Sequence, residues 1–150
     1  MTTTAKVTAV LLALAVGIVP IAALAVTLAR VEGAPAWLEI PFRLTCHGID
    51  ARALAIDGIP MPICARCLAI YAGGLAGIFL FLVPGPWRRY AVPTLFFLVA
   101  LVPMGVDGVT QALGLRESTN ALRMATGFPA GLVALVWVLG RIDRAARQAP

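Results

Sequence analysis

The sequence predicts an all-α, polytopic membrane protein with about four transmembrane helices in one bundle. Its composition is the first reason: 61% of the 150 residues are hydrophobic and 13% are charged, whereas a soluble domain has roughly 45–50% apolar and about 25% charged residues. The second reason is that the apolar residues form long runs, each able to cross a hydrocarbon core of about 30 Å. We therefore expect residues 1–150 to form a single membrane domain.

The expected helices are separated by charged or proline-containing segments. The first apolar run lies between Lys6 and Arg30, and the second follows Pro60 and Pro62, which are well placed in the first turn of a helix. For the first run a cleaved signal peptide is the alternative, with small residues at Ala22–Ala25, but its length favours a retained helix. We expect transmembrane helices at approximately residues 7–29, 63–83, 91–113 and 122–140.

The longest connection, residues 30–62, has no apolar run that could span a membrane. Its segment Ala36–Leu44 carries aromatic residues suited to headgroup depth and predicts a short helix at the interface. Asp57-Gly58 is a turn signal. We expect this connection to be an outer loop.

The arginine clusters predict the orientation. The positive-inside rule places the second connection and the end of the chain in the cytoplasm, and an even number of crossings then places both termini there. The protein is thus expected to be a multi-pass protein of the cell membrane, although arginines in the two outer segments reduce the asymmetry. The cytoplasmic cluster consists of Arg88, Arg89, Arg141, Arg144 and Arg147; the outer arginines are Arg30, Arg43, Arg52, Arg116 and Arg123.

The net charge of +5 does not indicate a nucleic-acid partner. The basic residues occur in short clusters between apolar runs, and no basic face is interleaved with aromatic residues. Clusters of this kind contact anionic headgroups. The expected partners are therefore membrane lipids, with no nucleic acid.

Three cysteines and the single histidine are all expected at the outer end of the bundle. Cys64 and Cys67 begin the second helix, where the helix N-terminus favours thiolates, and Cys46 and His47 lie in the preceding loop. Three sulfurs and an imidazole have the composition of a tetrahedral zinc site, so we expect these four residues to bind zinc. Adjacent residues rarely both reach one metal, so His47 has an alternative role as a catalytic base beside three thiolates and an open position. A Cys64–Cys67 disulfide, or cysteines that act only as small apolar residues, are the other interpretations.

The third helix ends in a polar stripe that includes Asp107 and Gln111, one turn apart. A carboxylate in a membrane helix is expected to face the bundle interior and to have a partner, here Arg116 or Arg123. Asp107 is a candidate general base, or a residue that orients a metal ligand. The alternative is a shallow position in contact with water.

Residues 116–123 are the most polar run of the chain. If this run continues helically into the fourth helix, Arg116, Asn120 and Arg123 share a face that suits a phosphate or a carboxylate. An ordinary loop, with Ser118 or Thr119 capping the helix, is the alternative. The candidate ligand-binding residues are Gln111, Arg116, Ser118, Thr119, Asn120, Arg123, Arg66 and Tyr71.

The second helix contributes two of these candidates and a packing motif. Arg66 lies between the cysteines and would stabilise thiolates or a bound anion, unless it only reaches the membrane interface. Tyr71 lies one turn beyond Cys67. Gly73 and Gly77 form a small-xxx-small pair that predicts a helix-packing seam.

These motifs resemble a family of small prokaryotic membrane proteins of unknown function. Its pattern is a CH pair, then P-x-C-A-R-C-x-x-I-Y, then D-G-x-T-Q-x-x-G-x-R-E-S-T-N-x-x-R. The matching residues here are Cys46-His47, Pro62–Tyr71 and Asp107–Arg123, within residues 42–131. The resemblance implies a membrane protein and brings no activity with it.

The residues therefore leave three functional hypotheses. In the first, a zinc-dependent hydrolase or transferase, or a binding protein, takes an anionic amphiphile at the outer interface. In the second, Cys46, Cys64 and Cys67 exchange disulfides with a quinone as partner, although a single loop cysteine and the arginine-rich run fit this less well. In the third, zinc is a structural clamp in a membrane scaffold.

Overall fold

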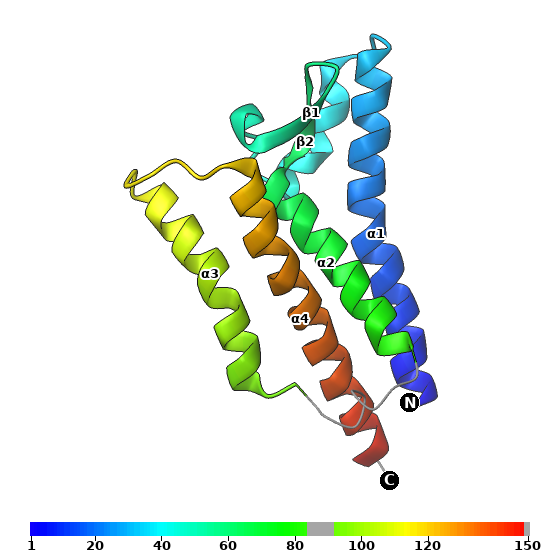
Figure 1. The fold of residues 1–150 in the computed structure, drawn as a ribbon. Coiled ribbons are helices and arrows are strands. Elements are labelled where there is room, and N and C mark those ends of the chain that lie inside the picture. The colour runs from blue at the N-terminus through cyan, green and yellow to red at the C-terminus, as the bar shows by residue number, and fades with distance from the viewer. Residues whose placement is uncertain (84–91, 149–150) are drawn as a thin grey trace.

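The computed structural model describes residues 1–83 and 92–148 and consists mainly of helices (Figure 1). Within these ranges, four helices are long and apolar enough to cross a membrane, which confirms the predicted fold class. They are α1 (Thr3–Val31), α2 (Ala65–Leu82), α3 (Thr94–Ala112) and α4 (Asn120–Gln148).

Helices α1 and α4 are longer than predicted, with 29 residues each. The polar end of α4, including Arg141 and Arg147, is helical rather than a tail. The start of α1 and the end of α4 lie at the same end of the bundle (Figure 1), where the Thr2 backbone N–H donates to the Asp143 carboxylate at 2.7 Å. The predicted pair Arg88 and Arg89 lies outside the described residues.

The tightest packing in the bundle is between α2 and α4, and glycines make it possible. A Cβ on Gly73 would overlap the carbonyl oxygen of Phe128, and a Cβ on Gly77 would overlap that of Leu132. From the other side, Gly131 lies against the backbone of Ile70. The predicted seam is therefore confirmed, and α4 supplies its second half, because small residues let two helix backbones approach closely in lipid.

The connection between α1 and α2 contains more structure than the sequence predicted. Ala36–Leu44 forms a 3₁₀ helix, η1, at the predicted position, and the Arg30 guanidinium at the end of α1 pairs with Glu39 in η1. An antiparallel hairpin of β1 (Ala53–Ile56) and β2 (Ile59–Cys64) follows. We did not predict this hairpin.

The hairpin turn explains why α2 begins two residues later than predicted. Asp57 and Gly58 have φ values of 47° and 80°, as a two-residue turn that matches the twist of a hairpin requires. Pro60 and Pro62 belong to β2 rather than to the first turn of α2. Prolines are tolerated there because each strand of a two-stranded sheet is an edge strand.

Helix α3 lies at the edge of the bundle beside α4 (Figure 1). Asp107 is the one residue between Thr94 and Ala112 that is buried. Phe97 stacks on Trp137 of α4 at 4.9 Å between ring centroids, and Arg141 donates to the Thr94 hydroxyl at 2.6 Å. The remaining apolar surface of α3 is exposed, as expected for a helix that faces lipid.

Candidate functional site

The polar candidates gather at one end of the bundle, opposite the two termini (Figure 1). Four parts of the fold meet there: the loop after η1, the junction of β2 with α2, the last turns of α3, and the connection from α3 into α4. This shared location was expected from the topology. The two features built there are a cysteine–histidine cluster and an arginine-lined pocket.

The cysteine–histidine cluster joins the η1 loop to the start of α2. The ligand atoms of Cys46, His47 and Cys64 all lie within 4.8 Å of one another. Cys46 and Cys64 are buried, His47 is exposed, and all cysteines are free thiols. The structure therefore brings together residues 18 positions apart, and it places the adjacent Cys46 and His47 close enough to share an ion.

Backbone amides support both buried sulfurs. The Cys64 N–H donates to the Sγ of Cys46 at 3.2 Å, and the Cys67 N–H donates to the Sγ of Cys64 at 3.4 Å, because Cys64 is the N-cap residue of α2. A hydrogen bond from the Cys67 side chain lowers the pKa of the Cys64 thiol, and the Cys67 N–H lowers it further, whereas burial acts in the opposite direction. Cys64 is thus favoured as a thiolate.

This donor set fits zinc. Zinc–sulfur bonds of about 2.3 Å in tetrahedral geometry place two ligand atoms roughly 3.8 Å apart, so donors within 4.8 Å need only a small adjustment. Amide hydrogen bonds to the sulfurs are a common support for metal thiolates. Cys67, which we also predicted as a ligand, is not in the group of three whose ligand atoms all lie within 4.8 Å of one another, but its side chain lies against both other thiols.

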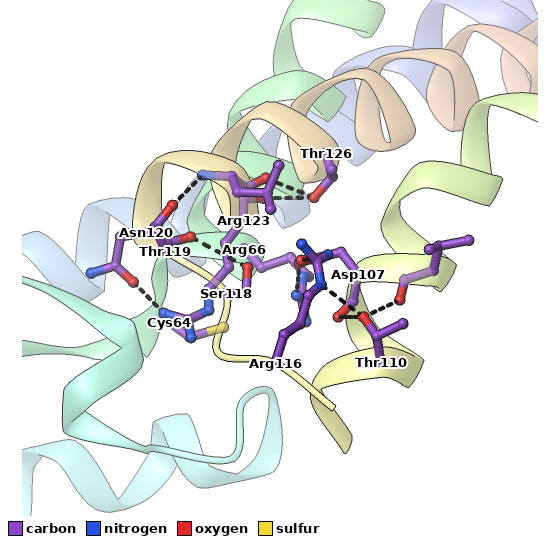
Figure 2. Close-up of polar contacts among 12 residues, drawn as sticks. Cys64, Arg66, Asp107, Thr110, Arg116, Ser118, Thr119, Asn120, Arg123 and Thr126 are labelled. Carbon is purple, nitrogen blue, oxygen red and sulfur yellow. Dashed lines mark hydrogen bonds and ion pairs between the residues drawn. The ribbon is translucent and has the colours of Figure 1, made fainter. Parts of the chain in front are cut away.

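The second feature centres on the buried carboxylate of Asp107, which is 1% exposed (Figure 2). One carboxylate oxygen accepts a hydrogen bond from Arg66 of α2, and the other accepts one from Arg116 at 2.6 Å. The Arg116 Nε also donates to the Thr110 hydroxyl at 3.0 Å. Asp107 is therefore an ion-pair centre, and Arg66 reaches it rather than the thiols.

Arg123 is a buried cation, with 5% of its surface exposed. Its Nη1 donates to the Asn120 side chain at 2.6 Å (Figure 2). Asn120 donates in turn to the Ala53 carbonyl of β1 at 2.9 Å. The Nε of Arg123 has no hydrogen-bond partner, and no carboxylate in residues 1–83 or 92–148 forms an ion pair with it. Arg123 thus holds a buried positive charge that forms no direct ion pair with a described residue, and Asp107 and Cys64 act on it only through longer-range electrostatics.

The arginine-lined pocket has a volume of about 470 Å³ and includes Arg116 and Arg123 in its lining. Ser118 and Gln111, both predicted as ligand-binding residues, line it. Arg52 also lines it and was missed, because the sequence offered only its position in the outer loop and no motif around it. The lining residues are Ile49, Ala51, Arg52, Gln111, Gly114, Arg116, Glu117, Ser118 and Arg123.

The remaining candidates have other surroundings. Thr119 accepts from the Leu122 N–H at 3.2 Å and so caps α4, as the loop interpretation predicted. Arg116 precedes the helix, which begins at Asn120, so the expected continuous helical face does not form. Tyr71 lies near Cys46 and Cys67 and is not part of the pocket lining.

Substitution of Asp107 tests the ion-pair centre. We expect Asp107→Asn to lower the free energy of unfolding by about 3 kcal/mol, because loss of the carboxylate leaves the partly buried Arg66 and the more exposed Arg116 without their counter-charge. Thermal unfolding in detergent would measure the loss, with Asp57→Asn as the control, because Asp57 is exposed in the hairpin turn. Equal stability of the two variants would contradict the role given to Asp107.

Comparison with known proteins identifies the family. The family model described as "Predicted membrane protein (DUF2085)" matches residues 46–137. An uncharacterized protein of Methanocaldococcus jannaschii is 41% identical over 99 residues, which are 65% of this chain and 64% of that protein. An uncharacterized protein of Methanothermobacter thermautotrophicus is 40% identical over 91 residues, which are 61% of this chain and 81% of that protein.

The chain thus covers slightly less than two thirds of the length of the Methanocaldococcus protein. No solved structure matches the chain. The family match includes the cysteine–histidine cluster, Asp107 and the arginine-rich connection, and it extends through most of α4. This chain belongs to the family of predicted membrane proteins DUF2085.

Proposed function

We propose that this membrane protein binds an anionic, lipid-like ligand in the arginine-lined pocket, beside a zinc site formed by Cys46, His47 and Cys64. The observation that carries the proposal is Arg123, a pocket-lining guanidinium that is 5% exposed and has no carboxylate partner among the described residues. A buried charge without a direct ion-pair partner is costly, and an anionic ligand in contact with it would reduce that cost.

Zinc would link the η1 loop to α2 beside the pocket. Arg123 lies within electrostatic reach of Cys64, so the metal cluster and the pocket are neighbours. When bound, zinc supplies a Lewis acid, while the chain's own residues hold the ligand: Arg116 and Arg123 by charge-assisted hydrogen bonds, and Gln111 and Ser118 by neutral ones. The exposed position of His47 leaves it accessible from the aqueous side.

Metal content tests the zinc site. We expect one zinc ion per chain in protein purified in detergent, and its loss in Cys46→Ser and Cys64→Ser, because each removes a buried thiolate ligand. Arg43→Gln, on the exposed surface of η1, is the control and should retain the ion. A Cys64–Cys67 disulfide in resting, metal-free protein would instead support thiol–disulfide exchange with a quinone.

Lipid binding tests the pocket. In detergent-solubilised protein, we expect Arg123→Gln to weaken binding of anionic phospholipids about tenfold or more, because hydrogen bonds to charged groups contribute about 1.5–3 kcal/mol. Arg43→Gln removes the same charge from the exposed surface of η1 without touching the pocket, and should have little effect. Equal weakening by both variants would indicate surface attraction only.

We also propose that the site faces the outside of the cell and that both termini are cytoplasmic. The basic end of α4, with Arg141, Arg144 and Arg147, supports this orientation through the positive-inside rule. A reporter that is active only in the cytoplasm should therefore be active when it is fused to either terminus. If both termini were instead found outside the cytoplasm, the cysteine cluster at the opposite end of the bundle would lie in the reducing cytoplasm, and this orientation would be wrong.

A further inference from the structure

The charges that line the pocket do not cancel. Arg52, Arg116 and Arg123 contribute three cations, and Glu117 contributes one carboxylate, a formal excess of two positive charges. Asp107 does not remove this excess, because the same carboxylate also binds Arg66, which is not among the lining residues. A ligand that neutralises the pocket must therefore carry two negative charges.

The arginines are also unequally engaged. Arg116 is fixed by Asp107 and Thr110, yet 42% of its side chain is exposed, so part of the guanidinium is free to contact a ligand (Figure 2). Arg123 retains a buried Nε without a partner. Arg52 forms no ion pair with any described residue. Three guanidinium groups therefore line one cavity and have N–H donors that no described residue uses. They come from the segment before β1, from the α3–α4 connection and from α4.

We infer that the pocket selects the head group of a lipid phosphate monoester over that of a phosphodiester. A monoester carries close to two negative charges at neutral pH and has three terminal oxygens that accept strong hydrogen bonds. A diester carries one charge and has two such oxygens. The excess of two charges and the three arginines match the monoester. This inference rests on the proposed function and specifies its ligand class.

The size and position of the pocket agree with a lipid rather than a free ion as the source. Its volume of about 470 Å³ falls in the roughly 300–1,000 Å³ range of small-molecule sites and exceeds what a single phosphate needs. The exposed apolar residues Leu113 and Leu115 adjoin the lining residue Gly114 in the chain. An acyl chain could pass along this apolar segment while the phosphate is held by the arginines.

The test compares two lipids that differ only in a methyl group on one phosphate oxygen. Purified full-length protein in detergent is titrated with phosphatidic acid and with phosphatidylmethanol of identical acyl chains, using phosphatidylcholine as the neutral reference. We expect phosphatidic acid to bind at least tenfold more tightly than phosphatidylmethanol. This preference should fall in Arg52→Gln and Arg116→Gln and persist in Arg43→Gln. Arg52→Gln is the cleaner variant, because Arg52 forms none of the ion pairs that hold the fold.

The outcomes separate this inference from the proposed function. Equal binding of phosphatidic acid and phosphatidylmethanol, both tighter than phosphatidylcholine and both weakened by Arg123→Gln, would overturn the monoester inference and leave anion binding intact. No preference for either anionic lipid over phosphatidylcholine would overturn the proposed function itself. If millimolar inorganic phosphate displaces phosphatidic acid, the pocket prefers a doubly charged ligand, and that ligand is free phosphate. If phosphatidic acid stays bound under these conditions, the ligand is the lipid.

Discussion

The buried carboxylate of Asp107 organises the functional end of this protein. Helix α3 buries no other residue, so its position there depends on the pairs that Asp107 forms with Arg66 and Arg116. A charged side chain in a membrane helix is costly, up to about 2.5–3.5 kcal/mol at the helix centre on insertion scales, which is why the carboxylate requires cations close by. Those cations come from α2 and from the α3–α4 connection. One ion-pair centre therefore fixes three segments and one wall of the pocket.

The glycine seam between α2 and α4 brings a second cation to the same place. Gly127 lies directly against the Arg66 carbonyl, so the close packing of the two helices extends to the arginines that they carry. Arg66 is neutralised by Asp107, whereas Arg123, one turn before Gly127 on α4, has no such partner. Close backbone packing in lipid, and not attraction between the side chains, thus leaves a positive charge in the pocket.

The hairpin connects the pocket to the cysteine cluster. Ala53 of β1 accepts the hydrogen bond of Asn120, which binds Arg123, and the same residue is the register partner of Cys64 in β2. Cys64 then begins α2 and holds Cys46 through its backbone N–H. A short strand pair thereby sets the spacing between the candidate metal ligands and the buried arginine. Arg52, which lines the pocket, belongs to the short 3₁₀ helix Asp50–Arg52 directly before β1.

The sequence by itself determined the membrane-helix fold, the gathering of polar residues at one end and the glycine face of α2, because hydropathy and helical periodicity are local properties of the chain. It did not predict the hairpin, since Pro60 and Pro62 suit both a helix start and an edge strand. Nor could it assign the partners of the arginines. Arg66 pairs with Asp107, Arg123 forms no direct ion pair and Arg52 lines the pocket because of the way in which α2, α3, α4 and the hairpin pack. Only the tertiary structure decided these, since electrostatic pairing in a low-dielectric environment follows distance in space and not spacing along the chain.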